Sequence, residues 1–309
     1  MKTVVITGGN RGLGLECARN IAAAGGWRIL LACRDPEAAK DGLEKLRRET
    51  GNRDIEAWAL DLASLASIEA FAARLRDSDF APLGALVCNA GIQVVSGTRK
   101  TEDGFELTFG VNHLGHFLLA NRLLDCLADT ARIVFVSSGT HDPATKSGLP
   151  GPELTDARAL AYPAEVGRDD AALVGRRRYT TSKLANLYTT YELARRLQGR
   201  GSGRVTANAF DPGMMPGTSL ARDYGPLARF VWKYFLPALT LFKPGVNRVE
   251  DSGKDLARLV LAEELAGTTG KYFVGRDIVR SSEESYDEAK ARDLWEASAD
   301  LVGLRTAKE

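Results

Sequence analysis

Short apolar runs alternate with longer amphipathic stretches along nearly the whole chain. Because the runs are continuously apolar, we expect strands that are buried on both faces, as in a parallel sheet covered by helices. The pattern predicts an α/β fold with a doubly wound parallel sheet of about seven strands and helices on both faces. The expected strands span residues 2–7, 28–33, 55–60, 85–88, 131–136, 205–210 and 271–274, and the expected helices span 15–24, 37–50, 65–75, 105–127, 179–197, 251–262 and 285–301.

The first expected strand runs directly into a glycine-rich turn, which a helix follows. A helix N-terminus offers free N–H groups and a positive dipole end to a pyrophosphate, and glycines let the backbone approach it closely. The spacing G-x-x-x-G-x-G differs from the usual dinucleotide fingerprint, and a plain turn is the alternative. The candidate cofactor-binding residues of this loop are Gly8, Asn10, Arg11, Gly12, Leu13 and Gly14.

Arginines stand where the second expected strand ends. An NAD site usually carries an acid near this position, but here uncharged Cys33 is followed by Arg34, and Arg11 lies in the glycine loop. Two guanidinium groups suit a 2′-phosphate, so we expect NADP(H); the alternative is that both are solvated. We expect Asp35 to cap the helix that starts at Pro36.

Polar residues also follow the later strands, at the edge where such sheets bind ligands. Within the helix expected at 105–127, Asn112 and Gly115 disfavour helix, which indicates a functional or packing reason. His113 and His116 are three apart, as metal ligands can be, but no acid or cysteine accompanies them, so we interpret both as packing residues and expect no metal. The strand-end candidates are Asp61, Leu62, Asn89, Ala90, Gly91, Ser137, Ser138, Asp211, Pro212 and Gly213.

A tyrosine and a lysine four positions apart begin the helix expected at 179–197. Tyr179 and Lys183 would lie on one helix face, with stems about 6 Å apart. A neighbouring ammonium lowers the pKa of a phenol from its usual value of about 10, which makes the phenol a usable acid or base. A solvated helix face gives the same pair by chance, so the assignment depends on the other motifs.

Two long segments interrupt the alternation. The insert 139–178 is rich in glycine, proline and charge, and it could form a lid or a wall of a substrate site. Its arginines at 176–178 would meet an acidic substrate, cofactor phosphates or only solvent. We interpret 214–247 as a substrate lid; its apolar part, 214–242, could instead dock on a membrane surface or fill core. No repeat or linker divides the chain, so residues 1–309 are expected to form one domain.

Composition narrows the partners and the compartment. The 41 basic and 40 acidic residues leave a net charge of +1, so we expect no nucleic-acid partner. The four cysteines have neither metal nor disulfide spacing. Because the chain begins in a strand-like run and has no apolar run long enough to span a bilayer, we expect a cytoplasmic protein without a transmembrane segment.

In their order, these motifs resemble the short-chain dehydrogenase/reductase family over nearly the whole chain. The chain is most similar to its branch of retinol dehydrogenases and light-dependent protochlorophyllide reductases, through residues 32–35, 104–107, 112–117, 294–296 and 301–304. The resemblance implies a Rossmann-type sheet. The matching residues are Thr7, Gly8, Gly12, Leu13, Gly14, Asp61, Leu62, Asn89, Ala90, Gly91, Asn112, Ser137, Ser138, Tyr179, Lys183, Asp211, Pro212 and Gly213.

The resemblance also implies a role for each catalytic candidate. Tyr179 would protonate a carbonyl oxygen or deprotonate an alcohol, and Lys183 would hold the nicotinamide ribose and depress the pKa of Tyr179. Ser138 would bond the substrate oxygen, and Asn112 would support a proton-relaying water. Gly8, Gly12 and Gly14 would bind the pyrophosphate, Asp61 and Asn89 the adenine and ribose side, and the backbone near Pro212 and Gly213 the nicotinamide. Thr218, six residues after Pro212, is off the usual register of the carboxamide-binding threonine.

Two departures bear on the branch. Ala185 stands where protochlorophyllide reductases typically have a cysteine, and Ser138 stands where they tend to lack a serine. We therefore predict an NADP(H)-dependent oxidoreductase that transfers a hydride between nicotinamide and a carbonyl or alcohol of a bulky apolar substrate. The alternatives are a light-dependent protochlorophyllide reductase and a non-catalytic NADP(H)-binding regulator. The residues leave a homo-oligomer and peripheral membrane contact open.

Overall fold

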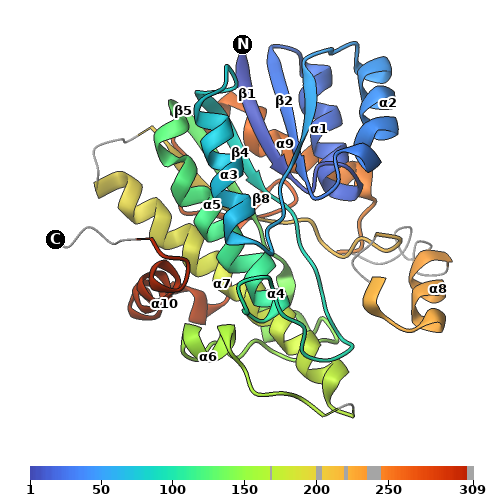
Figure 1. The fold of residues 1–309 in the computed structure, drawn as a ribbon, viewed down its shortest axis with the longest axis vertical. Coiled ribbons are helices and arrows are strands. Elements are labelled where there is room, and N and C mark those ends of the chain that lie inside the picture. Colours follow the sequence, from blue (N-terminus) through green and yellow to red (C-terminus); the bar gives the residue numbers. More distant parts are fainter. Residues whose placement is uncertain (168, 200–203, 219–221, 235–244, 305–309) are drawn as a thin grey trace.

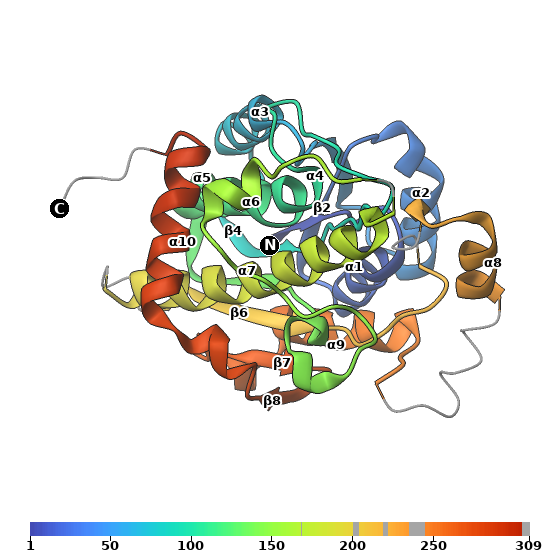
Figure 2. The same ribbon diagram turned by 90° about the horizontal axis from the view of Figure 1, so that it is seen from below.

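An eight-stranded sheet runs through the centre of the molecule, with helices on both faces (Figures 1 and 2). The computed structural model describes residues 1–167, 169–199, 204–218, 222–234 and 245–304. The strand order is β3-β2-β1-β4-β5-β6-β7-β8, with every pairing parallel except the antiparallel β7–β8 pair. The strands are β1 (Lys2–Thr7), β2 (Trp27–Cys33), β3 (Ile55–Ala59), β4 (Leu83–Cys88), β5 (Leu127–Val136), β6 (Thr206–Asp211), β7 (Tyr272–Val274) and β8 (Asp277–Val279).

The predicted doubly wound parallel sheet is confirmed, with one more strand than expected. The extra strand, β8, is a short edge strand whose three residues are all exposed. An exposed edge strand needs no apolar run, so the hydrophobic pattern could not indicate it.

Side chains of the strands alternate between two apolar cores, one on each face of the sheet. In β1, Val5 belongs to one core, while Val4 and Ile6 belong to the other. Both faces therefore exclude water, which explains the continuously apolar strands. Over the first core lie α3 (Leu65–Arg76), α5 (Gly115–Leu123), α7 (Ala171–Gly199) and α10 (Glu288–Leu301), and over the second lie α1 (Gly12–Ala24), α2 (Lys40–Thr50) and α9 (Val249–Leu261).

The expectation of one helix over residues 105–127 is wrong. The segment contains α4 (Leu107–Phe109), a π-helical turn over Gly110–Leu114, and α5, and Leu127 already belongs to β5. Asn112 and Gly115 indicated that the helix is disfavoured here, but their positions do not predict a π turn. π turns often occur at functional sites, and this one contains Asn112.

The insert 139–178 is less irregular than its composition indicated. The helix expected at 179–197 begins at Ala171, so the last residues of the insert form the first turns of α7. Upstream lies the short α6 (Ala157–Ala161). The insert also contacts α7 beside Tyr179, because the Thr180 hydroxyl donates a hydrogen bond of 3.0 Å to the Pro150 carbonyl. The described part of the insert thus forms a wall along α7.

The start of α7 touches the loop that follows β4 at a glycine. A Cβ atom on Gly175 would lie 2.0 Å from the carbonyl oxygen of Val94. Only a residue without a side chain allows this approach of the two backbones. Because Gly175 lies one helical turn before Tyr179, the contact fixes where that turn of α7 lies.

The segment 214–247 is described only in part, since residues 219–221 and 235–244 lie outside the described structure. Its helix α8 (Pro226–Tyr234) stands apart from the rest of the fold in Figures 1 and 2. Leu227 and Phe230 are 77% and 51% exposed, so the described part of α8 does not fill core. Among the residues described, no helix is both long and apolar enough to cross a bilayer.

Gly175→Ala should lower both stability and activity. The added methyl group must displace the backbone at Val94, which we expect to cost about 1–3 kcal/mol of unfolding free energy and to move the turn that carries Tyr179. Gly199→Ala is the matched control, because a Cβ there meets nothing within 4 Å and should be neutral or slightly stabilising. Urea unfolding curves measure the stability of both variants. Equal stability of the two variants would contradict the close contact.

Candidate active site

The predicted catalytic residues gather beyond the carboxyl ends of the parallel strands, the edge onto which Figure 2 looks. Ser138 follows β5, whereas Tyr179 and Lys183 come from α7 and Asn112 from the π turn. Tyr179, Lys183 and Asn112 are buried, and Ser138 is partly exposed. The structure therefore brings together side chains that lie far apart in the sequence.

Asn112 joins the loop after β4 to α7. Its Oδ1 accepts a hydrogen bond of 2.8 Å from the backbone N–H of Ile92. Its Nδ2 donates to the Ile92 carbonyl at 2.9 Å and to Ser182 Oγ at 3.0 Å. Ser182 Oγ in turn donates to the carbonyl of Tyr179 at 2.7 Å. A fully buried amide with these partners fixes both elements relative to each other.

Lys183 joins α7 to the end of β5. Its ammonium donates to the carbonyl of Val136 at 3.0 Å, and Ser137 Oγ donates to the carbonyl of Lys183 at 2.8 Å. Burial disfavours the charged form and lowers the pKa of Lys183 to about 8, although the charge of Asp211 opposes this change. The lysine is therefore a cation at neutral pH that loses its proton more easily than an exposed lysine.

Tyr179 is held protonated by its surroundings. Burial is the largest cause that raises its pKa, and the charge of Asp211 acts in the same direction, while interaction with the Ser138 hydroxyl lowers it. The pKa of Tyr179 is thus raised, whereas the sequence predicted that Lys183 would lower it. The Nζ atom of Lys183 lies 5.5 Å from the centre of the Tyr179 ring. Desolvation outweighs the neighbouring charge here. Tyr179 is therefore a phenol rather than a phenolate at neutral pH, and the raised pKa makes it a weaker acid than an exposed tyrosine.

Asp211 has a larger electrostatic effect on the site than the sequence indicated. It is the last residue of β6 and is buried, with Oδ1 accepting from the Gly213 N–H at 2.9 Å and Oδ2 from the Tyr272 hydroxyl at 3.1 Å. A Cβ on Gly139 would lie 2.9 Å from Oδ2, so the carboxylate also borders the turn after Ser138. In the sequence, the only indication of this role was that Asp211 is a charged residue at the end of an apolar strand.

Thr7 connects the glycine loop to the end of β4. Its hydroxyl oxygen accepts from the backbone N–H groups of Asn89 and Ala90 at 2.9 and 3.0 Å, and it lies 2.9 Å from His116 Nε2. Asn89 Nδ2 donates to the Thr7 carbonyl at 2.7 Å. His113 is likewise buried, with Nε2 2.8 Å from Ser298 Oγ. These contacts agree with the packing interpretation of both histidines.

The glycine loop has the features of a phosphate cradle. Gly8 and Gly12 have positive φ angles of 64° and 54°, and a Cβ on Gly14 would lie 2.6 Å from Asn89 Nδ2. Nothing lies within 4 Å of a Cβ on Gly12, so the loop is open on that side. The N-terminus of α1 has no side-chain cap at Arg11, which leaves its first N–H groups for a ligand. The loop therefore fits the pyrophosphate of a dinucleotide.

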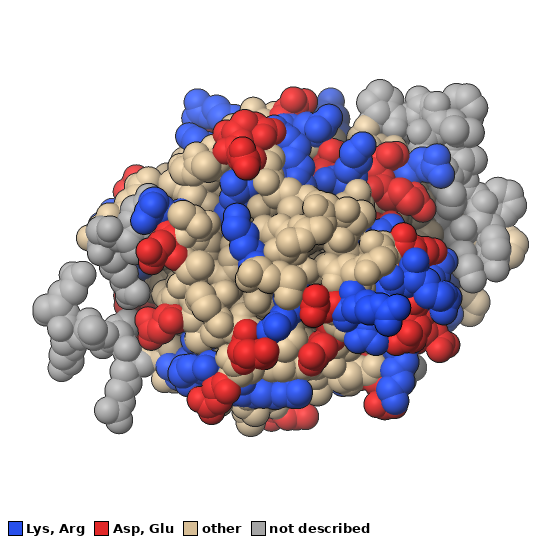
Figure 3. Space-filling view, turned by 90° about the horizontal axis from the view of Figure 1, so that it is seen from above, with Lys and Arg blue, Asp and Glu red and all other residues tan. Residues whose placement is uncertain are grey.

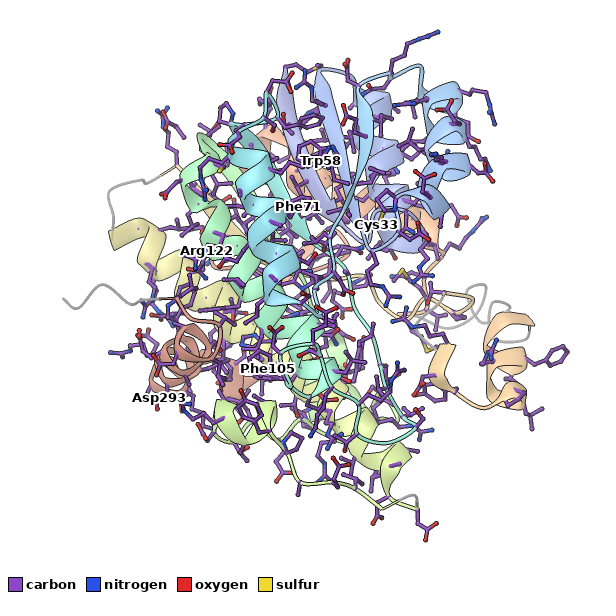
Figure 4. The ribbon with its side chains drawn as sticks, in the orientation of Figure 1. Cys33, Trp58, Phe71, Phe105, Arg122 and Asp293 are labelled. Carbon is purple, nitrogen blue, oxygen red and sulfur yellow. The ribbon has the colours of Figure 1, made fainter. Side chains whose placement is uncertain are left out.

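Near this loop, Arg11, Arg34 and Arg222 interact electrostatically. Cys33, labelled in Figure 4, ends β2, and Arg34 follows it. Desolvation is the largest cause that lowers the pKa of Arg222, and the charges of Arg11 and Arg34 act in the same direction. Arg222 was missed in the sequence because it lies in an otherwise apolar segment. Asp35 Oδ1 accepts from the Ala38 N–H at 3.1 Å, so it caps the following helical turn as expected. The charge of Asp223 opposes the lowering of the Arg222 pKa, but the clustered cations still repel one another, so the cluster fits a phosphate.

The other candidates lie at the same edge. Asp61 Oδ1 accepts from the Ala63 N–H at 2.9 Å, within the turn that leaves β3. The Pro212 carbonyl accepts from Ser252 Oγ at 2.7 Å, and Gly213 has a φ angle of 72°. Thr218 Oγ1 donates to the Met215 carbonyl at 3.0 Å. Leu13 and Leu62 are buried, while Asn10, Ala90 and Gly91 have exposed atoms.

None of the predicted catalytic residues lies at the opposite edge of the sheet. Figure 3 looks onto it and shows an uncharged centre bordered by charges of both signs. A hollow there is lined by residues such as Lys2, Trp27 and Arg132, at the amino ends of the strands. Ligands of open α/β sheets bind at the carboxyl ends, where the catalytic candidates lie.

Comparison with known proteins gives the class. A family model described as short chain dehydrogenase matches residues 2–147, and one described as AcuH dehydrogenase domain matches residues 219–309. Retinol dehydrogenase 13 of Homo sapiens is 40% identical over 306 residues, which cover 98% of this chain and 85% of that protein. The chain belongs to the short-chain dehydrogenase family and is an oxidoreductase of that family.

Two further comparisons agree with this assignment. Protochlorophyllide reductase B, chloroplastic, of Oryza sativa subsp. japonica is 36% identical over 321 residues, which cover 98% of this chain and 77% of that protein. The crystal structure of an uncharacterized protein from Mycobacterium paratuberculosis has a TM-score of 0.72 and 29% identity, covering 98% of this chain and 94% of that one. The predicted resemblance to the retinol dehydrogenase and protochlorophyllide reductase branch is confirmed.

The lowered pKa of Lys183 predicts how stability depends on pH. An unfolded lysine has a pKa of about 10.4, whereas the folded value is about 8. Between these values the unfolded chain binds more protons, so the contribution of Lys183 to the free energy of unfolding rises with pH. We therefore compare the free energies of unfolding of the wild type and of Lys183→Met. Their difference, wild type minus variant, should increase by about 3 kcal/mol from pH ~8 to pH ~10.5.

Urea unfolding at several pH values measures this difference. Lys45→Met, at an exposed lysine of α2, is the control, and its difference from the wild type should stay flat. A flat difference for Lys183→Met as well would contradict the burial of a charged lysine.

Proposed function

We propose that the protein transfers a hydride between NADP(H) and a carbonyl or alcohol of a bulky apolar substrate. The observation that carries this proposal is the convergence of Ser138, Tyr179, Lys183 and Asn112 at the carboxyl edge of the sheet. A pure binder would not need a buried phenol beside a buried ammonium. The nicotinamide supplies the hydride when it is bound, and the protein supplies the proton.

The protein groups fit the reduction of a carbonyl. The Tyr179 phenol is protonated at neutral pH, so it has a proton to donate to the oxygen that becomes an alcohol. Ser138, whose hydroxyl interacts with the phenol, donates a second hydrogen bond to the same oxygen. Lys183 holds the nicotinamide ribose, and Asn112 fixes α7 and supports a proton-relaying water.

NADP(H) is the proposed cofactor because of the charges around the glycine loop. Gly8, Gly12 and Gly14 form the cradle for the pyrophosphate, and Arg11 and Arg34 bind the 2′-phosphate. Asp35, the acid nearest to the end of β2, is used as a helix cap and does not bind the ribose. The adenine and ribose side lies near Asp61 and Asn89.

The apolar substrate is supported by the segment 214–247. Leu227, Phe230 and Val231 of α8 are exposed apolar side chains in the described part of this segment, and they offer a surface for an apolar molecule. Similarity to a retinol dehydrogenase supports the same substrate class.

Light-dependent protochlorophyllide reduction is a second candidate, favoured by the 36% identity to such an enzyme from Oryza sativa. Ala185 argues against it: the residue is completely buried in α7 and has no thiol. Ser138, which interacts with the Tyr179 hydroxyl, argues for carbonyl chemistry in the dark.

Arg34→Gln should weaken the use of NADPH selectively. Loss of a charge-assisted contact to the 2′-phosphate should lower kcat/KM for NADPH roughly ten- to a hundredfold and leave that for NADH within about twofold. Arg48→Gln, at an exposed arginine of α2, is the control and should change neither value. Initial rates with both cofactors measure the effect; an equal loss for NADPH and NADH would reject the phosphate clamp.

Tyr179→Phe should abolish turnover while NADPH binding is kept. The phenylalanine fills the same space but has no proton to donate, so we expect a loss of at least about a hundredfold in kcat. The assay follows NADPH consumption in the dark with aromatic ketones, quinones and retinal, and a parallel plate contains protochlorophyllide with and without light. Turnover seen only under light would favour the second candidate, and undiminished turnover by the variant would exclude Tyr179 as the acid.

A further inference from the structure

The loop after β4 contains a polar side chain with an unused donor. Gln93, two residues beyond the Asn89-Ala90-Gly91 motif, is only 4% exposed. Its Oε1 accepts a hydrogen bond of 3.1 Å from the Tyr224 hydroxyl, whereas its buried Nε2 has no hydrogen-bond partner among the described residues. A buried donor without an acceptor is unfavourable, so this one indicates a partner beyond the described residues.

The neighbours of Gln93 place it beside the catalytic turn of α7. On one side, Ile92 is bonded to Asn112, which also donates to Ser182 of α7. On the other side, the carbonyl of Val94 lies against Gly175 of α7. Gln93 therefore runs along the stretch of α7 between Gly175 and Ser182, and that stretch contains Tyr179.

Residues 222–224 cover this stretch from the other side. Asp223 Oδ2 accepts hydrogen bonds from the backbone N–H groups of Val95 and Ser96 at 2.7 and 3.0 Å. These bonds dock the segment onto the loop and bring Tyr224 to Gln93. Tyr224 also acts electrostatically on Tyr179, whose pKa it raises. Gln93 and Tyr224 thus border the space next to the catalytic phenol.

An arginine of α7 lies beside the same tyrosine. Of the three consecutive arginines, Arg177 pairs with Glu153 at 2.9 Å and Arg178 lies 3.9 Å from Glu106. Arg176 has no carboxylate partner among the described residues. Its guanidinium lies 5.5 Å from the centre of the Tyr224 ring, and its buried Nε has no hydrogen-bond partner in the described structure.

We propose that Gln93 and Arg176 form a subsite for a carboxylate that the substrate carries at a distance from its reacting carbonyl. Gln93 Nε2 and Arg176 Nε are buried donors without a partner among the described residues, and both side chains lie next to Tyr224. The guanidinium adds the charge that a carboxylate neutralises. A neutral oxygen would leave that charge uncompensated. The inference rests on the proposed function and narrows its substrate to an apolar carbonyl compound with an acidic end.

Matched pairs of substrates test the subsite. Aromatic aldehydes that carry a carboxylate on linkers of increasing length are each compared with their methyl esters, with NADPH as the reductant. We expect the wild type to prefer the acid at one or more linker lengths, and the ratio of kcat/KM for acid over ester to fall at least roughly tenfold in Arg176→Gln. Arg176→Lys keeps the charge and should restore part of the preference. Gln93→Leu should lower the ratio as well.

Arg177→Gln is the control, because Arg177 is paired with Glu153 at the surface, and its ratio should equal that of the wild type. Equal turnover of acid and ester by the wild type would overturn the subsite and leave the proposed function standing. An equal ratio of kcat/KM for acid over ester in Arg176→Gln and Arg177→Gln would also overturn the subsite and leave the proposed function standing. If the wild type reduces none of these aldehydes and none of the ketones, quinones and retinal above, the proposed function fails and this inference fails with it.

Discussion

The arrangement of the site depends on one buried amide. Asn112 bonds both backbone groups of Ile92 and the hydroxyl of Ser182, so one side chain connects the loop after β4 to the helix that carries Tyr179. The π turn that contains Asn112 lies at the start of α5, inside the core. A buried amide must satisfy its hydrogen bonds there, which leaves the two elements little freedom to move apart.

Burial also sets the electrostatics of the site. Desolvation raises the pKa of Tyr179 and lowers that of Lys183, so both groups are pushed toward their neutral forms. Asp211 opposes the change at the lysine and reinforces the change at the tyrosine. Tyr179 is thus a protonated phenol beside the ammonium of Lys183, which loses its proton easily. The buried carboxylate of Asp211, which accepts from the Tyr272 hydroxyl, lies near both. This arrangement suits reduction of a carbonyl better than a permanently ionised phenol would.

Much of the fold follows from sequence, because strands covered on both faces must be continuously apolar and ligand groups gather at their carboxyl ends. That logic predicted the sheet and the place of Ser138. Helix spacing pointed to Tyr179 and Lys183, a position that disfavours helix pointed to Asn112, and the family resemblance implied their roles. The same logic missed the π turn, which was marked only by residues that disfavour helix, and β8, which is exposed. It also missed Gln93, Tyr224 and Arg222, whose importance depends on contacts between segments distant in sequence. The contribution of Lys183 to the pKa of Tyr179 was overestimated because burial is not visible in a spacing.

Transfer of isotope from the cofactor tests the central claim most directly. Wild-type protein is incubated in the dark with NADPH deuterated at the nicotinamide C4 and with an aromatic carbonyl compound, and the product is analysed by mass spectrometry. The account predicts an alcohol that carries deuterium on the former carbonyl carbon. An alcohol without deuterium, or deuterium found only after illumination and on a reduced carbon–carbon bond, would contradict it.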